Sequence, residues 1–294
     1  MSAPREEKRA MKPDSQVAVV GGGTMGVGIA QVFAVAGCAV TVVEPDAARA
    51  GGIVARVTDS VARAAARGKL PADAAEAVPG RITVATDIDR LPADLDLVVE
   101  AVPERLDLKR TVLAAIERRG PRLLGSNTSG IGIGELGARL DDPGRLIGLH
   151  FFNPVPAMPL LEIVVADTTD DATVDAARDA AALIGKEVIV VRDRPGFATS
   201  RLGVMLGLEA VRMLEDGVAS AADIDRAMEL GYRHPMGPLR LTDLVGLDVR
   251  LDIARNLAAA YGPRFDPPQL LIDKVAAGEL GKKTGRGFHV WDAS

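Results

Sequence analysis

Residues 16–37 read QVAVVGGGTMGVGIAQVFAVAG and carry the clearest structural signal in the chain. QVAVV is a strand candidate and GIAQVFAVAG a helical one, so the stretch reads strand, turn, helix. Between them, Gly21, Gly23 and Gly26 match the pattern G-x-G-x-x-G. The first glycine of such a turn permits a tight bend, the second lets backbone approach a pyrophosphate, and the third lets the helix pack on the strand. The stretch therefore predicts a strand–turn–helix unit that binds a dinucleotide.

The residues around this turn sharpen the prediction. Thr24 and Met25 open the expected helix, where backbone N–H groups face the phosphates of a bound dinucleotide. Glu44 ends the next expected strand, at about the spacing of the acid in this motif, roughly 20 residues on. An acid there accepts hydrogen bonds from ribose hydroxyls and repels a 2′-phosphate, which favours NAD over NADP. An ordinary surface glutamate is the alternative, and nearby Arg49 leaves the phosphate preference open.

Short apolar runs alternate with helical patterns through the first two-thirds of the chain. Strands are predicted at 16–20, 39–44, 81–86, 96–102, 122–127, 145–151, 160–166 and 187–193. The main helical segments between them are 45–78, 106–119 and 171–185. This alternation predicts an α/β fold with a mostly parallel sheet covered on both faces.

The pattern changes after Pro195, where no further strand is expected. Helical spacing covers 196–217, 221–231, 236–262 and 267–280. We therefore predict a Rossmann-type NAD-binding domain at 15–194 and a smaller all-helical domain at 195–294. Residues 1–14 are charged and are expected to form a disordered extension.

Composition narrows the function classes. The chain has 294 residues, a formal charge of −5 and an isoelectric point near 5.4, which argues against nucleic-acid binding. No run approaches the roughly 18 apolar residues of a membrane span, and the N-terminus lacks the apolar core of a secretory signal. One cysteine, Cys38, excludes an intrachain disulfide and a multi-cysteine metal site. We expect a cytoplasmic protein with no metal site and no membrane partner.

The stretch LHFFNPVPAMPLLE at 149–162 holds the best catalytic candidate. His150 closes an expected strand, and ligands of α/β folds sit beyond the carboxyl ends of strands. Asn153-Pro154 and Pro156 stiffen the backbone that follows. Glu162 lies in an otherwise apolar strand, where an acid is costly to bury without a partner. A histidine is its most interesting partner.

Such a pair suits the oxidation of an alcohol by NAD. The reaction needs a base for the hydroxyl proton, and imidazole serves near neutral pH. A carboxylate on the other ring nitrogen fixes the tautomer and stabilises the imidazolium. These residues alone leave a satisfied structural histidine as an equal alternative for His150.

Seven segments occur in the order expected of the 3-hydroxyacyl-CoA dehydrogenase family, which the chain resembles over about residues 15 to 292. They are VAVVGGGTMGVGIAQVFAVAG, DLVVEAVPERLDLK, SNTSG, GLHFFNPVPAMPLLEIV, DRPGF, HPMGPLRLTDLVGLDV and GKKTGRGF. The HFFNPVP segment is highly specific. The resemblance implies a Rossmann-type domain, a helical C-terminal domain that usually forms a homodimer, and an acyl-CoA substrate.

The resemblance also implies roles for individual residues. His150 matches the family's general base, Glu162 its carboxylate partner, and Ser129 a serine near the reacting oxygen of the substrate. Positions that line the NAD site are matched by Glu104, Lys109, Asn153 and Lys283. Ser60 and Arg67 fall about where the family contacts the CoA phosphates, although solvated helix residues are the alternative.

One position departs from the family pattern. The family has Asn-Arg two residues after PGF, whereas this chain reads Pro195-Gly196-Phe197-Ala198-Thr199-Ser200-Arg201. Ser200 therefore stands where an asparagine helps to hold the substrate's polar oxygens. A serine has one hydroxyl donor against two N–H donors and a carbonyl. A bridging water or Thr199 can replace the donor that asparagine would supply. Alternatively, the serine marks an acyl group different from that of other family members.

Three functions are consistent with the sequence. The leading one is an NAD-dependent dehydrogenase of short-chain (S)-3-hydroxyacyl-CoA, such as 3-hydroxybutyryl-CoA. The same chemistry on an acyl-carrier-protein thioester or a free 3-hydroxy acid is the second. A non-catalytic NAD(H)-binding protein is the third, and the His150–Glu162–Ser129 set argues against it.

Overall fold

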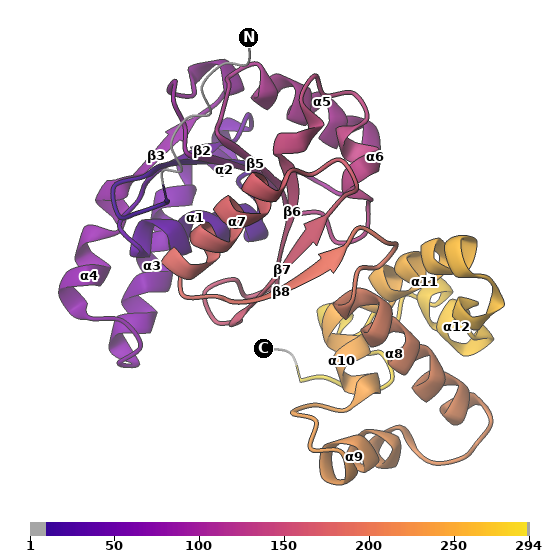
Figure 1. The fold of residues 1–294 in the computed structure, drawn as a ribbon. Coiled ribbons are helices and arrows are strands. Elements are labelled where there is room, and N and C mark those ends of the chain that lie inside the picture. The colour runs from indigo at the N-terminus through magenta and orange to yellow at the C-terminus, as the bar shows by residue number, and fades with distance from the viewer. Residues whose placement is uncertain (1–9, 293–294) are drawn as a thin grey trace. The chain divides into compact units, whose positions relative to one another are not determined.

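The computed structural model describes residues 10–292, which divide into two compact units, 10–193 and 194–292. Over the first unit the chain forms an eight-stranded sheet in the order β3-β2-β1-β4-β5-β6-β7-β8 (Figure 1). The strands are β1 (Gln16–Val20), β2 (Ala39–Val43), β3 (Ile82–Ala85), β4 (Leu97–Glu100), β5 (Leu123–Ser126), β6 (Leu146–Phe151), β7 (Leu160–Val165) and β8 (Glu187–Arg192). These positions confirm the expected strands to within two residues at each end.

All neighbouring strands run parallel except β6 and β7, which are antiparallel. The strand order reverses between β1 and β4, because β2 and β3 lie on one side of β1 and the later strands on the other. Ligands of open α/β sheets bind at the carboxyl ends of the strands beside such a reversal. The glycine turn after β1 and the segment after β4 both lie there.

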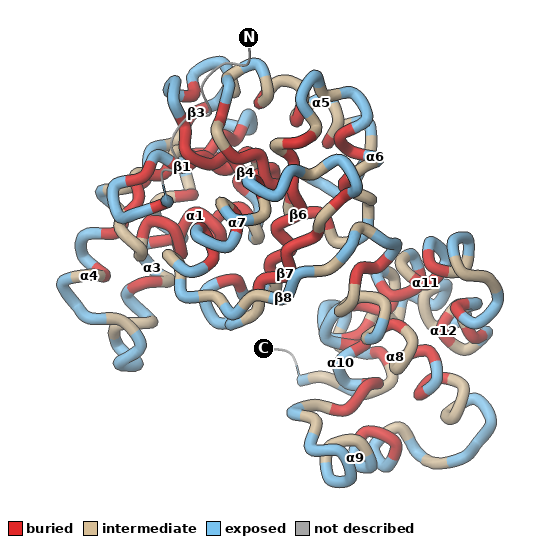
Figure 2. Tube along the Cα trace, in the orientation of Figure 1, coloured by how far each residue is buried: buried red, intermediate tan, exposed pale blue. Residues whose placement is uncertain are grey.

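Helices connect the strands of this unit: α1 (Thr24–Val35), α2 (Ala47–Gly51), α3 (Ile53–Ala66), α4 (Ala72–Ala77), α5 (Leu106–Glu117), α6 (Ile133–Gly137) and α7 (Asp171–Leu183). The buried residues follow the sheet centre and the helix faces turned toward it (Figure 2). Helix α1 is buried over most of its length, including Phe33, and it contacts β1, β2 and α3. This burial anchors the helix whose N-terminus begins at the glycine turn.

The segment 45–78 is helical as expected and forms three helices, because Gly51-Gly52 ends α2 and Gly68, at a φ of +66°, follows the end of α3. One sequence expectation for this unit needs correction, because the sheet is not covered on both faces along its whole width. Edge strand β8 is largely exposed, and Ile189 and Val190 each keep more than a third of their surface accessible.

The second unit is helical over its described residues, with α8 (Thr199–Glu215), α9 (Ala221–Gly231), α10 (Pro238–Val245), α11 (Leu247–Tyr261) and α12 (Gln269–Ala276). The segment 236–262 breaks into α10 and α11 at Gly246, whose φ of +106° suits glycine. Val204, Leu208, Leu251 and Phe265 belong to the core of this unit. Short 3-10 turns complete the chain: Pro79–Arg81, Ile88–Arg90, Pro143–Arg145, Pro263–Phe265 and Lys282–Thr284.

The expected N-terminal extension falls mostly on residues 1–9, which lie outside the described residues. From Ala10 onward the chain is described, and Met11 is buried in the core of the first unit. The α/β fold class, with a Rossmann-type sheet and a helical C-terminal unit, is confirmed.

Candidate active site

The glycine turn after β1 has the geometry of a phosphate-binding turn. Gly21 has a φ of +116°, and a Cβ there would lie 2.6 Å from the carbonyl oxygen of Ala101. A Cβ on Gly26 would lie 1.8 Å from the carbonyl oxygen of Gly21, so no side chain fits at either position. Beside Gly23, by contrast, no atom lies within 4 Å of a built Cβ. The turn is closed toward β4 and open toward the start of α1, where Thr24 and Met25 lie.

Glu44 is a buried acid beside this turn. Its carboxylate accepts hydrogen bonds from the backbone N–H of Gly22 at 3.1 Å and of Asp46 at 3.0 Å, and from Arg49 Nη2 at 2.9 Å. Burial opposes ionisation, but these hydrogen bonds outweigh it and hold the pKa of Glu44 below its ordinary value. Arg56 Nη2 donates to the carbonyl oxygen of Gly22 at 2.7 Å and fixes the turn from the other side. The result is an anionic group at the end of β2.

His150 and Glu162 face each other across the antiparallel pair β6–β7. The strand register places the two residues directly opposite, and His150 Nδ1 lies 2.8 Å from Glu162 Oε2. Glu162 is fully buried and His150 is 7% exposed. The ring of Phe152 packs against the imidazole with 4.5 Å between ring centroids. The contact expected from the sequence is therefore present, and with Nδ1 donating to the carboxylate, Nε2 carries the lone pair.

The segment after β6 is held to β5 and to the start of β8. The amide oxygen of Asn127 accepts a hydrogen bond from the Phe151 N–H at 3.0 Å. Lys186 donates to the carbonyl oxygens of Val155 at 2.6 Å and Met158 at 2.5 Å. Asn153 is exposed and joined to Pro154 by a cis peptide bond. The chain that follows His150 is therefore held in place by hydrogen bonds from Asn127 and Lys186.

A second cluster of charges is buried at the end of β4. Lys109 and Glu100 are both fully buried, and Lys109 Nζ lies 2.8 Å and 3.1 Å from the two oxygens of Glu100. Lys109 also donates to the carbonyl oxygen of Val102 at 3.2 Å and lies 3.2 Å from Glu104 Oε2. Ser126 donates its hydroxyl to Glu100 Oε2 at 2.6 Å. The lysine is neutralised entirely from within the sheet unit.

Glu104 connects this cluster to the loop that carries Ser129. Its Oε1 accepts hydrogen bonds from the Thr128 hydroxyl at 2.7 Å, the Ser129 N–H at 2.9 Å and the Gly130 N–H at 3.1 Å. Burial opposes ionisation of Glu104, but the charge of Lys109 and these donors hold its pKa below the ordinary value. The position of Ser129 therefore depends on a chain of contacts that begins at Glu100.

Sequence reasoning missed Glu100, Ser126 and Thr128. A signal was available, because Glu100 ends the apolar run LVVE just as Glu44 follows TVV. An acid that closes a buried strand requires a partner. The sequence did not reveal whether that partner was Lys109 or one of the arginines beside it, such as Arg105 and Arg110.

The remaining predicted residues lie on other elements. Ser60 and Arg67 are two turns apart on one face of α3, with Ser60 half-buried and Arg67 exposed at its C-terminal end. In the helical unit, Lys283 Nζ lies 2.6 Å from both carboxylate oxygens of Asp248. Ser200 lies in the first turn of α8.

The sheet unit fits NAD. Its glycine turn leaves room for a phosphate at a helix N-terminus, and Glu44 places an ionised acid at the end of β2. The comparison with known families agrees. Residues 16–194 match the NAD-binding domain of 3-hydroxyacyl-CoA dehydrogenase, and residues 196–291 match its C-terminal domain. The chain belongs to the 3-hydroxyacyl-CoA dehydrogenase family. As a member of that family it is an NAD-dependent oxidoreductase of 3-hydroxyacyl-CoA.

Individual family members are similar along nearly the whole chain. A 3-hydroxybutyryl-CoA dehydrogenase of Mycobacterium tuberculosis is 43% identical over 281 residues, 94% of this chain and 98% of the relative. One from Bradyrhizobium diazoefficiens is 40% identical over 278 residues, 93% of this chain and 94% of the relative. The crystal structure of (S)-3-hydroxybutyryl-CoA dehydrogenase from Ralstonia eutropha is 39% identical with a TM-score of 0.91, covering 95% of this chain and 100% of that one. Between residues 10 and 292, no helix is long and apolar enough to span a bilayer.

Proposed function

We propose that this dehydrogenase oxidises short-chain (S)-3-hydroxyacyl-CoA, such as 3-hydroxybutyryl-CoA, to the 3-oxoacyl-CoA and catalyses the reverse reduction. The observation that carries the proposal is the buried His150–Glu162 pair, with 2.8 Å between Nδ1 and Oε2. Relatives named 3-hydroxybutyryl-CoA dehydrogenase, at 40–43% identity, support the short acyl chain.

His150 is the general base of the proposed reaction. Its Nδ1–H donates to Glu162, so Nε2 takes the proton from the C3 hydroxyl of the substrate. The proton gives His150 a positive charge, which the fully buried carboxylate of Glu162 stabilises. When bound, NAD supplies the acceptor for the hydride that leaves C3. In the reverse direction His150 returns its proton to the oxygen of the 3-oxo group.

Other residues hold the reactants in this proposal. Ser129, positioned by Glu104, donates its hydroxyl to the oxygen on C3. Ser200, in the first turn of α8 in the helical unit, stays a prediction from the family resemblance. In the sheet unit, NAD is held by Gly21, Gly23, Thr24, Met25, Gly26, Glu44, Glu104 and Asn153, while the fully buried Lys109 holds Glu104 in place. Lys283, in the helical unit, stays a prediction from the family resemblance. Ser60 and Arg67 on α3 approach the CoA phosphates.

Steady-state oxidation of NADH with acetoacetyl-CoA tests the activity, and His150→Gln tests the base. Loss of a positioned general base lowers kcat by ~10²–10⁴. NADH binding, followed by fluorescence, is expected to persist in the variant because the glycine turn and Glu44 are untouched. Absence of turnover by folded wild-type protein across several acyl lengths contradicts the proposed function. Equal activity of wild type and variant removes His150 as the base.

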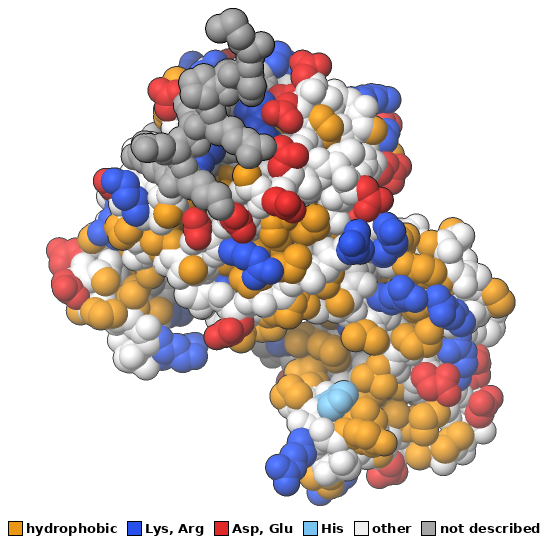
Figure 3. All heavy atoms as spheres, in the orientation of Figure 1, with side chains coloured by type: hydrophobic (Ala, Val, Ile, Leu, Met, Phe, Trp, Pro, Cys, Tyr) orange, Lys and Arg blue, Asp and Glu red, His pale blue; other side chains and the backbone are white. Residues whose placement is uncertain are grey.

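The homodimer and the cytoplasmic location are also part of the proposal. Figure 3 shows apolar side chains gathered on the surface of the helical unit. Large exposed ones on α8, α10 and α11 are Leu202, Leu241, Leu244, Val245 and Val249. Exposed apolar patches of this kind mark interaction surfaces, which supports association through this unit. Sedimentation velocity tests the homodimer, and a monomer at micromolar concentration contradicts it.

The single cysteine supports a reducing compartment, which is consistent with the proposed cytoplasmic location. Fractionation of the source cells tests this location.

A further inference from the structure

The segment 152–159, which follows the strand of His150, cannot satisfy all of its own backbone carbonyl groups. Three of its eight residues are prolines, which have no backbone N–H to donate: Pro154, Pro156 and Pro159. The N–H groups of Ala157 and Met158 both donate to the carbonyl oxygen of Pro154, at 2.9 Å and 3.1 Å. Other carbonyl groups of the segment therefore need donors from elsewhere, because backbone groups that leave water require a hydrogen-bond partner.

Lys186 supplies two of these donors. It lies between α7 and β8, and its Nζ donates to the carbonyl oxygens of Val155 at 2.6 Å and Met158 at 2.5 Å. The backbone N–H of Glu187 donates to the carbonyl oxygen of Pro159 at 2.9 Å. Hydrogen bonds from an ionised donor are roughly twice as strong as those between neutral groups. Lys186 therefore holds the segment at two points, and Glu187 holds it at a third.

The ammonium of Lys186 is bound by carbonyl groups and not by a carboxylate. Burial lowers the pKa of the lysine, and no carboxylate within the described part of the chain offsets this effect. A partly buried cation loses hydration, and hydrogen bonds to the two carbonyl oxygens compensate for that loss. The charge of Lys186 is thus directed at the backbone of the segment and at no acid.

The way in which α7 ends does not explain these contacts. The helix ends in a left-handed glycine, Gly185 at a φ of +65°, after which the Lys186 N–H donates back into the helix. Helix α3 ends in the same way, at Gly68 with a φ of +66° and Lys69. Lys69 is exposed, and its ammonium forms no hydrogen bond with any described residue. This helix ending therefore forms without the lysine ammonium, so the contacts of Lys186 have a separate role.

The side chain of Val155 is held in place as well as its carbonyl group. Val155 is 2% exposed and belongs to the core of the sheet unit. It packs against Gly28 of α1, where a Cβ would lie 2.9 Å from the Cβ of Val155. Helix α1 begins at the glycine turn that fits NAD. Lys186 and Gly28 together therefore fix the segment relative to the dinucleotide-binding turn.

Two residues of the segment lie at the proposed site of reaction. The ring of Phe152 packs against the His150 imidazole, with 4.5 Å between ring centroids. Asn153 is exposed, and in the proposed function it holds NAD. Because Asn153 lies two residues before Val155, a shift of Val155 displaces Asn153 too. The alignment of His150 with Glu162 is set separately, by the register of β6 and β7.

We propose that Lys186 is a positioning residue of the dehydrogenase, whose ammonium holds the segment 152–159 so that Asn153 keeps NAD in the orientation required for hydride transfer. In this role Lys186 acts through the carbonyl groups of Val155 and Met158. Misplacement by about 1 Å can lower the rate of the chemical step ~100-fold, because the reacting atoms leave their productive geometry. The inference rests on the proposed function, to which it adds a residue outside the site.

Substitutions of Lys186 test the proposal. Lys186→Met removes the donor, whereas Lys186→Arg keeps the charge and the N–H groups. For Lys186→Met we expect kcat for reduction of acetoacetyl-CoA to fall ~10- to 100-fold. The dissociation constant for NADH, measured by fluorescence, should change much less, because the glycine turn and Glu44 are intact. Lys186→Arg should recover a large part of kcat.

Arg178→Met is the matched control. Arg178 is an exposed cation on α7, the helix that precedes Lys186. Its substitution removes a positive charge from the same helix and leaves the segment 152–159 untouched. We expect this variant to keep the wild-type kcat.

Two measurements separate positioning from general stabilisation of the fold. The pH dependence of kcat/KM in Lys186→Met should match that of wild type, because strand register aligns His150 with Glu162. Hydrogen exchange, followed by mass spectrometry, should become faster at the N–H groups of Ala157 and Met158 and stay unchanged in β1 and β4. Lys186→Gln keeps an N–H donor and replaces Lys186→Met in all measurements if that variant does not fold.

The outcomes distinguish this inference from the proposed function. If wild-type enzyme does not reduce acetoacetyl-CoA, the proposed function fails and the inference falls with it. If wild type is active and Lys186→Met or Lys186→Gln keeps the wild-type kcat, only the inference fails. Exchange that rises equally in β1, β4 and the segment 152–159, with no recovery of kcat in Lys186→Arg, would assign Lys186 a general structural role and overturn the inference.

Discussion

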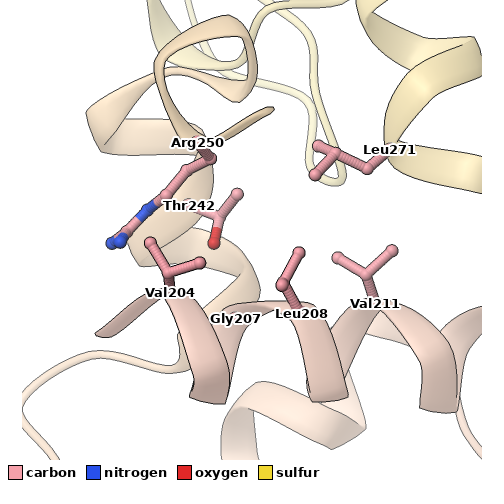
Figure 4. Close-up of a pocket in the computed structure, with 7 residues that line it drawn as sticks. All are labelled: Val204, Gly207, Leu208, Val211, Thr242, Arg250 and Leu271. Atoms are coloured by element: carbon pink, nitrogen blue, oxygen red, sulfur yellow. The ribbon is translucent and has the colours of Figure 1, made fainter. Parts of the chain in front are cut away.

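Lys109 and Arg250 are both cations buried against helices, and they are neutralised in opposite ways. Lys109 lies within 3.2 Å of oxygens from Glu100, Glu104 and Val102, all in the sheet unit. Arg250, in the helical unit, is also buried (Figure 4), and its Nε has no hydrogen-bond partner among residues 10–292. Burial of a charge is therefore not informative by itself. The informative observation is whether the fold supplies a partner for the buried cation, as at Lys109, or leaves a buried nitrogen without one, as at Arg250 Nε.

Cys38 shows a third way to bury an ionisable group. The thiol is fully buried, and burial, followed by the charge of Asp96, raises its pKa to about 11. Cys38 therefore stays neutral, which requires no partner. An arginine has no such option near neutral pH, so the comparison between Lys109 and Arg250 concerns groups that remain charged.

The largest effect is expected for Glu100→Gln. This change leaves Lys109 buried with its main counter-charge removed, and breaking a buried ion pair from one side typically destabilises by ~3–5 kcal/mol. Urea denaturation measures the free energy of unfolding. The double variant Glu100→Gln/Lys109→Met is the control and should recover much of the loss. A single variant within ~1 kcal/mol of wild type would show that Lys109 is not neutralised by Glu100.

Arg250→Met, unlike Glu100→Gln, should not lower the free energy of unfolding. The substitution removes a charge that the fold does not neutralise, and replacing buried ionic groups with apolar ones of similar volume is often neutral or stabilising by ~1–4 kcal/mol. We expect the free energy of unfolding of Arg250→Met, measured without substrate, to equal or exceed that of wild type. A loss comparable to that of Glu100→Gln would mean that Arg250 has an internal partner, and the contrast between the two cations would disappear.

A smaller effect is expected from Glu104, which links Lys109 to the Ser129 loop. Because the folded-state pKa of Glu104 is lowered, its ionised form stabilises the fold above the unfolded pKa of about 4.3. That contribution is lost as the pH falls through the folded-state value. The thermal midpoint of Glu104→Gln, measured between pH 7 and pH 3.5, should fall less steeply than that of wild type. If the thermal midpoints of wild type and variant fell equally with pH, ionised Glu104 would not stabilise the fold.

The smallest effect is expected for chemical labelling of Cys38 in the native protein. At pH 8 a buried thiol with a pKa of about 11 is almost entirely protonated, so labelling by a disulfide reagent should follow unfolding of the chain. The rate should rise with denaturant, and one thiol per chain should react in the unfolded protein. Rapid labelling of native protein would show that the thiol is accessible.

Strand positions, the glycine turn and the partnership of His150 with Glu162 could all be predicted from the sequence. Each rests on local patterns, namely apolar runs, G-x-G-x-x-G and an acid in an apolar strand. The partnership was accessible because Glu162 and His150 lie on strands joined by one short connection. The pair of Glu100 and Lys109 was harder to predict, since one lysine and several arginines follow β4 and only the packing of α5 selects Lys109.

The spacing of apolar residues could not predict where the helical segments break. It also could not predict that Arg250 is buried. Gly246 separates α10 from α11 with a φ of +106°, yet an isolated glycine is also tolerated inside a helix. Arg250 looks like a solvated charge in an amphipathic pattern. Only the packing of α11 against α8 shows that Nη1 of Arg250 lies beside Gly203 and that Nε has no hydrogen-bond partner among the described residues. Tertiary contacts decide such cases.

The single antiparallel pairing, β6 with β7, also bears on how this enzyme can diversify. His150 and Glu162 are matched by strand register and not by the connection 152–159 between them. Insertions in that connection can therefore leave the two side chains opposite each other, whereas a one-residue slip of β7 would turn Glu162 to the other face of the sheet. Evolution, or a protein engineer, can thus vary the loop beside the reaction while the proton-transfer pair stays aligned.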